Sequence, residues 1–179
     1  MYNIVGALFT NESEARQAMD ALIETPQING TTIYQISLVK RKEGVLKLCD
    51  NFSSEYLKSN DAVKGGLIGG LIGILTGPVG MLLGGAAGAL LGKAGEENKR
   101  DESAALIEQA AQKLEEGDIA LIGLVEEADE SILDHALVKF NTVIVRYDAD
   151  VISKELEEAE KLQEEMARQA REKLREAEK

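Results

Sequence analysis

The only histidine of the 179-residue chain, His135, lies in an acidic segment where residue types and spacing could support chemistry. Asp129, Glu130 and Asp134 are close to it in sequence, and an imidazole with carboxylates can bind a divalent metal or transfer a proton. Two further glutamates precede them, but the spacing is not that of a calcium loop. A lone surface histidine on a short acidic helix explains the pattern better, so we expect no metal site.

Two other features fall short of known chemical motifs. Residues 92–94 resemble the end of a phosphate-binding loop, but Ala87 and Ala94 replace its required glycine and hydroxyl residue. The single cysteine, Cys49, allows neither an internal disulfide nor a cysteine-built zinc site, and we expect it to be a small core residue of a strand. The sequence therefore predicts no enzyme activity and no cofactor.

The charge of the chain limits its partners. It has 32 acidic and 20 basic residues, which gives a formal net charge of −12. Phosphate neutralisation supplies most of the affinity for nucleic acid, so we expect no nucleic-acid partner. The start of the sequence, residues 1–4, lacks the basic and apolar pattern of a signal peptide, which predicts a cytoplasmic location.

Glycine is concentrated in one uncharged stretch. Eleven of the 17 glycines lie from Gly65 to Gly92, between Lys64 and Lys93. Eight of them recur at steps of four within two series, a spacing that lines one side of a helix and lets two backbones approach closely. These eight are Gly65, Gly69, Gly73, Gly77, Gly80, Gly84, Gly88 and Gly92.

Pro78 divides this run into a hairpin of two helices, at about residues 65–75 and 79–92. Each arm is only about 16–20 Å long, against about 30 Å for the hydrocarbon core of a bilayer. The hairpin can therefore dip into one leaflet, pack against hairpins of other copies, or be buried in its own domain. We expect Lys64 and Lys93 at a membrane interface, and ten side chains in membrane or subunit contact: Leu67, Ile68, Leu71, Ile72, Leu75, Met81, Leu82, Leu83, Leu90 and Leu91.

The remaining pattern predicts an α+β domain. Apolar runs indicate strands at residues 4–9, 32–39, 45–49, 119–125 and 142–147, and helical spacing indicates helices at 11–23, 101–114 and 132–137. Asn11 is a candidate cap for the first helix. Without the glycine-rich insertion, this order is that of a ferredoxin-like split β-α-β sheet. Gly6 and Gly123 lie mid-strand, where they either let the covering helices approach closely or mark a bulge.

The last 30 residues contain 17 charged ones and one narrow apolar seam, which predicts a long amphipathic helix. Its seam includes Ile152, Leu156, Leu162, Met166 and Leu174. We therefore divide the chain into a ferredoxin-like domain at 1–63 plus 98–148, a glycine-zipper hairpin at 64–97, and a charged helix at 149–179.

The strand end at Phe9–Asn11, the helix start at Glu14-Ala15 and the zipper from Gly65 to Gly92 resemble one family. It comprises uncharacterised bacterial membrane proteins whose general-stress-type, ferredoxin-like domain carries an inserted glycine zipper. The resemblance covers about residues 1–148. It implies this fold, no known enzyme activity, and membrane or stress association, and it transfers no catalytic residues.

Together these observations predict a non-enzymatic, homo-oligomeric protein whose glycine hairpin is the working element. In the first alternative the hairpin associates shallowly with a lipid bilayer, at the inner face of the cell membrane. In the second the protein is a soluble self-assembling scaffold or shell protein, with the hairpins buried between subunits.

Overall fold

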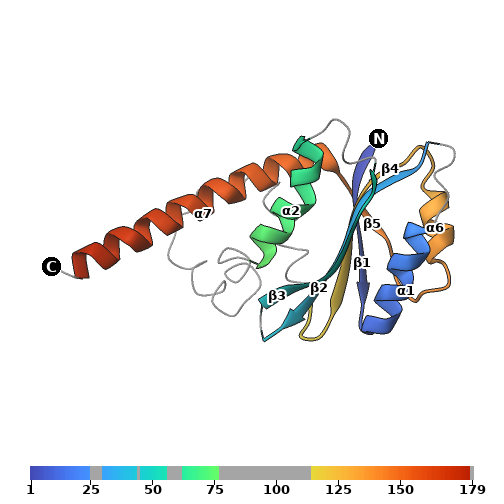
Figure 1. The fold of residues 1–179 in the computed structure, drawn as a ribbon, viewed down its shortest axis with the longest axis horizontal. Coiled ribbons are helices and arrows are strands. Elements are labelled where there is room, and N and C mark those ends of the chain that lie inside the picture. The colour runs from blue at the N-terminus through green and yellow to red at the C-terminus, as the bar shows by residue number, and fades with distance from the viewer. Residues whose placement is uncertain (25–29, 44, 56–61, 77–113, 178–179) are drawn as a thin grey trace, which may run out of the picture.

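Nine helices and strands are defined in a computed structural model that describes residues 1–24, 30–43, 45–55, 62–76 and 114–177. The strands are β1 (Tyr2–Phe9), β2 (Thr32–Lys42), β3 (Val45–Ser53), β4 (Ile119–Glu126) and β5 (Val145–Asp148). The helices are α1 (Glu12–Ile23), α2 (Ala62–Thr76), α6 (Ser131–Leu137) and α7 (Ala149–Ala177). The expected α+β class is confirmed, together with the long C-terminal helix (Figure 1).

The strands form one five-stranded sheet in the order β3-β2-β4-β1-β5, and every neighbouring pair is antiparallel. β4 pairs with β1 on one side and with β2 on the other, although the glycine-rich run separates it from both in sequence. The strands before and after that run therefore meet in one sheet, as expected. Seven of the eight residues of β4 are buried, since neighbouring strands and helices enclose it on all sides.

Helix α1 begins where the sequence predicts. The side chain of Asn11 accepts hydrogen bonds from the backbone N–H groups of Ser13 and Glu14, which satisfies two of the free donors at the helix start. Ala15, Ala18, Met19 and Leu22 are buried, as the helical spacing predicts. The carboxylate of Glu14 accepts a hydrogen bond from the backbone N–H of Asn141, which ties the start of α1 to the segment after α6.

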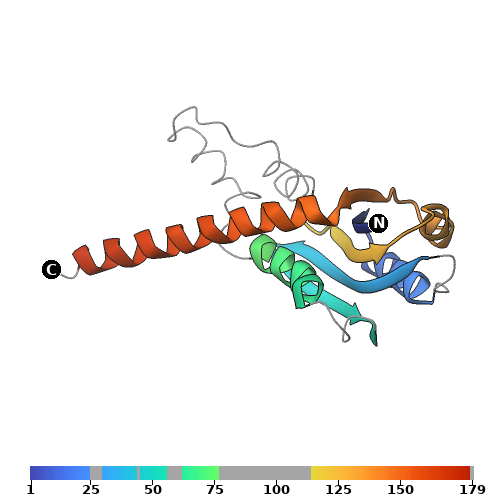
Figure 2. The ribbon, with the colours of Figure 1, turned by 90° about the horizontal axis from the view of Figure 1, so that it is seen from above.

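Helices cover both faces of the sheet, which gives three layers (Figures 1 and 2). Helices α1 and α6 pack on one face, in a cluster that includes Leu22, Leu121 and Leu133. Helices α2 and α7 pack on the other, in a cluster that includes Ile68 and Ile152. The expected hairpin and tail segments thus contribute helices to the same core as the sheet. Residues 77–113, which include the expected second arm and all but the last residue of the expected helix at 101–114, lie outside the described part.

The two mid-strand glycines make room for neighbouring strands rather than for helices. A Cβ atom at Gly6 would lie 3.1 Å from Cγ2 of Val145 in β5. At Gly123 it would lie 3.1 Å from Cγ2 of Val5 and 3.3 Å from the backbone oxygen of Gln35. The pairing of β2 with β4 also shifts register just beside Gly123, between Ile33 and Gln35. The register shift supports the expectation of a nearby bulge. The expectation that the glycines let covering helices approach is not supported, because the close neighbours are strand residues.

We predict that Gly123→Val lowers the free energy of unfolding by about 1–3 kcal/mol, because the added atoms would overlap Val5 and a backbone oxygen that cannot move freely. Urea denaturation followed by circular dichroism measures this. Gly66→Ala in α2 is the control, since no heavy atom described lies within 4 Å of its Cβ position. Equal stability of the two variants would contradict the prediction.

Candidate functional site

Helix α2, the first half of the glycine-rich run, has two different sides. Leu67, Ile68, Leu71 and Ile74 are buried, Ile68 completely, in the cluster against the sheet and α7. The glycines Gly66, Gly69 and Gly73 lie on the opposite, exposed side. Within the described part of the chain, nothing comes within 4 Å of a Cβ atom built at any of these three. We call Gly66, Gly69 and Gly73 the outer glycine face of α2.

The structure places some of the side chains that we expected in membrane or subunit contact elsewhere. Leu67, Ile68 and Leu71 contact the chain's own core, whereas the sequence assigned them to membrane or subunit contact. Ile72 is partly buried against the same cluster. The reason is that the sheet has a second apolar face that needs covering, and a local sequence pattern does not reveal it.

Helices α2 and α7 meet at a glycine that the four-residue spacing did not select. A Cβ atom at Gly70 would lie 2.7 Å from Cδ2 of Leu156 and 3.4 Å from Oε1 of Glu160, so any larger residue there requires the Leu156 side chain to move. The adjacent glycine pairs 65–66 and 69–70 could have predicted this contact. Their second members are also four residues apart, so they form a second glycine stripe next to the expected one.

The other expected residues divide into two groups. Lys64, Gly65 and Leu75 belong to α2, and Leu162 belongs to α7. Gly77, Gly80, Met81, Leu82, Leu83, Gly84, Gly88, Leu90, Leu91, Gly92 and Lys93 lie outside the described residues.

The tail seam changes character along α7. Ile152 and Leu156 are buried in the core, and Met166 is partly buried against it. Leu174, by contrast, is 66% exposed. Figures 1 and 2 show the outer half of α7 extending away from the sheet. The seam therefore serves the chain's own fold at its start and is open to solvent at its end.

The acidic segment that suggested chemistry is organised around Arg146, which the sequence analysis did not single out. Its guanidinium donates to both carboxylate oxygens of Glu127, at 3.0 and 3.2 Å, and to Oδ1 of Asp134 at 2.8 Å. Glu127 has a side chain only 1% exposed, and it also accepts from Nδ2 of Asn3 at 3.2 Å. Arg146 further donates to the backbone oxygen of Glu130. The cluster joins β1, β5 and the start of α6.

These contacts favour the charged form of each group. Burial lowers the pKa of Arg146, but the hydrogen bonds to Glu127 and Asp134 outweigh burial and raise this pKa above its ordinary value. A backbone hydrogen bond from Ser131 lowers the pKa of Asp129. The charges thus compensate one another in a structural ion cluster.

His135 does not complete a metal site. It is exposed on α6, and its Nδ1 lies 2.6 Å from the backbone oxygen of Ser131. Among the residues that the structure describes, no group of three or more His, Cys, Asp and Glu side chains could hold a metal ion.

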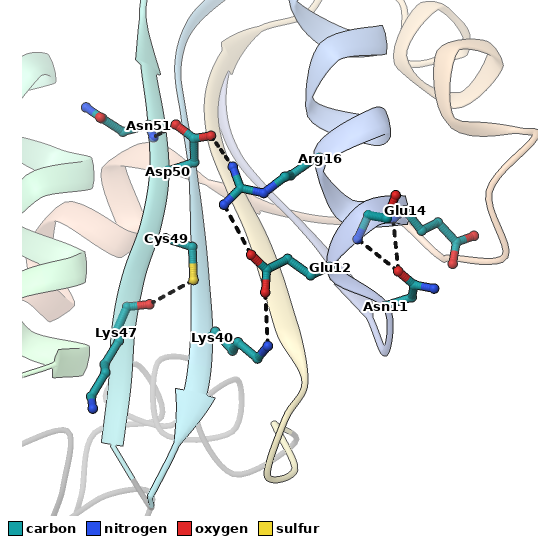
Figure 3. A network of polar contacts seen from close by, with 10 residues as sticks. Asn11, Glu12, Glu14, Arg16, Lys40, Lys47, Cys49, Asp50 and Asn51 are labelled. Carbon is teal, nitrogen blue, oxygen red and sulfur yellow. Dashed lines mark hydrogen bonds and ion pairs between the residues drawn. The ribbon is translucent and has the colours of Figure 1, made fainter.

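A second polar network ties α1 to the β2–β3 hairpin (Figure 3). Arg16 forms ion pairs with Asp50 and with Glu12, and Lys40 lies 3.0 Å from Oε2 of Glu12. Hydrogen bonds from Lys40 and then Arg16 lower the pKa of Glu12. Cys49, beside this network, is half-buried, and its thiol lies 3.7 Å from the backbone oxygen of Lys47. The side chains of these ion pairs are largely exposed, which argues against a reactive site. Because the pairs link α1 to β2 and β3, we assign them a role in positioning the hairpin.

Comparison with known proteins places this architecture in a family. The profile described as "Protein of unknown function (DUF1269)" matches residues 62–177, from the start of α2 to the end of α7. The chain belongs to this family. No curated protein and no solved structure matches it significantly.

The DUF1269 match spans α2 and α7 together with β4, α6 and β5. The family unit therefore includes both helices that cover one face of the sheet, as well as the outer glycine face. Its description assigns no function. None of the described helices combines the length and the apolar character needed to cross a bilayer.

We predict that Arg146→Met lowers the free energy of unfolding by about 3–5 kcal/mol, because it leaves the buried carboxylate of Glu127 without its cation. Adding Glu127→Gln should recover part of this loss, since the amide oxygen still accepts from Asn3. Chemical denaturation of the two single variants and the double variant gives the coupling energy. Strict additivity of the two losses would show that the pair is not coupled.

Proposed function

We propose that this protein is a non-enzymatic homo-oligomer whose copies associate through the outer glycine face of α2. The observation that carries the proposal is the division of α2, which turns its large apolar side chains inward and leaves Gly66, Gly69 and Gly73 outside. Glycine on one side of a helix lets a second backbone approach closely.

The energetic cost of these glycines supports a role in contact. Each interior helical glycine costs about 1 kcal/mol relative to alanine. At Gly70 the cost has a purpose within the chain, because Leu156 occupies the space that a side chain would need. At Gly69 and Gly73 the described residues provide no such neighbour. A close helix contact formed when copies associate would explain why glycine is present at these two positions.

Association between copies fits the geometry better than shallow insertion into a bilayer. Insertion requires large apolar side chains on the outside of the helix, but Leu67, Ile68 and Leu71 lie against the sheet. The outer glycine face offers mainly backbone, which suits close helix packing. Membrane association at the inner face of the cell membrane, with the stress role implied by the resemblance, is the alternative that the second experiment below tests.

We further propose that β2, β4, β1 and β5, with α1 and α6, form a ferredoxin-like core. The supporting observation is that β4 lies between β1 and β2, while β1 lies between β4 and β5. The unit β1-α1-β2 therefore has β4 between its two strands, and the unit β4-α6-β5 has β1 between its two strands. In this description β3 is an added edge strand, and α2 and α7 are additions that cover the open face.

We predict that Gly69→Leu with Gly73→Leu weakens self-association at least tenfold without unfolding the protein, because the new side chains block backbone approach and their Cβ atoms meet no described residue within 4 Å. Sedimentation equilibrium measures the association, and circular dichroism measures the fold.

Gly70→Leu is the matched contrast, since it places the same side chain one residue away, against Leu156. It should lower the free energy of unfolding by about 1–3 kcal/mol by overpacking the α2–α7 contact. If the Gly69–Gly73 variant associates as strongly as the original protein, the proposal is wrong.

Flotation with phosphatidylcholine–phosphatidylglycerol vesicles separates the two alternatives. We expect discrete lipid-free particles in the dense fraction. Flotation of the original protein, lost in the Gly69–Gly73 variant, would replace assembly with membrane association as the role of this face.

A further inference from the structure

The outer half of α7 is a second surface without a cover in the described structure, and it is independent of the glycine face. Residues 167–175 are all exposed, and the helix extends beyond the sheet there (Figure 2). At 1.5 Å per residue, the 29 residues of α7 measure about 44 Å. Its exposed stretch, residues 167–175, is only nine residues long, and a helical stretch of that length gains little stability by itself in water, which favours a packing partner.

The apolar stripe of α7 continues onto this outer half. Ile152 and Leu156 begin the stripe inside the core, and Met166, Ala170 and Leu174 extend it at steps of four. Charged residues occupy the opposite side of the helix. A stripe that is buried at its start and 66% exposed at Leu174 favours a second helix packed along its outer part.

Charge along α7 is distributed with opposite signs in its two halves. Residues 150–165 contain seven carboxylates and two lysines. Residues 166–177 contain four basic and two acidic residues. Parallel pairing of two such helices sets the acidic halves side by side, which is repulsive. Antiparallel pairing sets each acidic half near a basic half, so the charge pattern selects a second copy in the antiparallel direction.

The positions of individual charges define a register. Glu164 and Arg171 are seven residues apart, so they lie on the same flank of the helix, beside the stripe. A two-fold axis midway between them brings Glu164 of each copy to Arg171 of the other. The same axis brings Arg175 to the level of Glu160.

We infer that two copies of the chain pair in antiparallel fashion along the outer half of α7, with reciprocal Glu164–Arg171 ion pairs beside a seam formed by Met166, Ala170 and Leu174. This contact goes beyond the glycine-mediated association and requires neither that face nor a membrane. The acidic first half of α7 opposes binding to an anionic lipid surface, which favours polybasic helices.

Charge reversal tests the ion pairs. Glu164→Arg places arginine opposite arginine in both copies, and we expect the pairing to weaken roughly tenfold in sedimentation equilibrium at low salt. Adding Arg171→Glu re-creates the pairs with exchanged signs and should restore the association. Glu164 and Arg171 are too far apart to pair within one helix, so recovery of the association at unchanged helix content, measured by circular dichroism, requires contact between copies.

Glu165→Arg is the control, since Glu165 lies about 100° around the helix from Glu164, away from the flank that carries Arg171. It makes a charge change of the same size and should leave the association nearly unchanged. If Glu164→Arg has no effect, or if the double variant fails to recover, the proposed register is wrong.

Cross-linking tests the direction of the pairing. In a Cys49→Ser background, Ala170→Cys places the two thiols at levels about 7.5 Å apart along an antiparallel pair, whereas Leu174→Cys separates them by about 20 Å. A short bis-maleimide should therefore join copies of the first variant and not of the second. Cross-linking of both variants would show parallel pairing, and cross-linking of neither would overturn the inference.

The same experiment in the Gly69→Leu, Gly73→Leu background separates the two contacts. We expect the Ala170→Cys cross-link to persist there, because α7 pairing does not use α2. Loss of the cross-link in that background would overturn the independence of the two surfaces.

Discussion

The rest of the structure depends on the position of β4 in the middle of the sheet. Its backbone is hydrogen-bonded on both sides, to β1 and to β2, and its side chains are buried on both faces. A central strand with two apolar faces needs a covering layer on each. Helices α1 and α6 provide one layer, and α2 and α7 provide the other. This demand explains why half of a glycine-rich, uncharged run and the start of a highly charged tail belong to one core.

Covering that second face determines how α2 can be used. Leu67, Ile68, Leu71 and Ile74 pack against the sheet and α7, so the side of α2 that the described residues leave uncovered is built from glycine. Gly70 shows what such a residue can do, because α7 approaches α2 closely at that position. The outer glycines repeat the same property on the opposite side of the helix. In α7 the situation is reversed, since the first part of its seam is used internally and the last part is free for association.

The charged clusters have structural roles in this architecture. Arg146 binds the carboxylates of Glu127 and Asp134 and the backbone oxygen of Glu130, all in the stretch from the end of β4 into α6, and the carboxylate of Glu127 is almost fully buried. A buried carboxylate is stable there only because the guanidinium and Asn3 compensate it. The acidic segment around His135, which looked most like a reactive site in the sequence, is thus part of the support for β5. The association surfaces that we propose lie elsewhere, on α2 and α7.

The sequence by itself determined the local elements, because their signals lie within a few residues of one another. Asn11 predicted the start of α1, apolar runs predicted the five strands, and a continuous stripe predicted α7. Only the tertiary structure decided that β4 enters between β1 and β2, that the leucines of α2 face inward, and that Gly70 contacts Leu156. It also brought Arg146 to Glu127, which are 19 residues apart in sequence. Such contacts depend on strand order and helix placement, and periodicity within one segment carries no information about either.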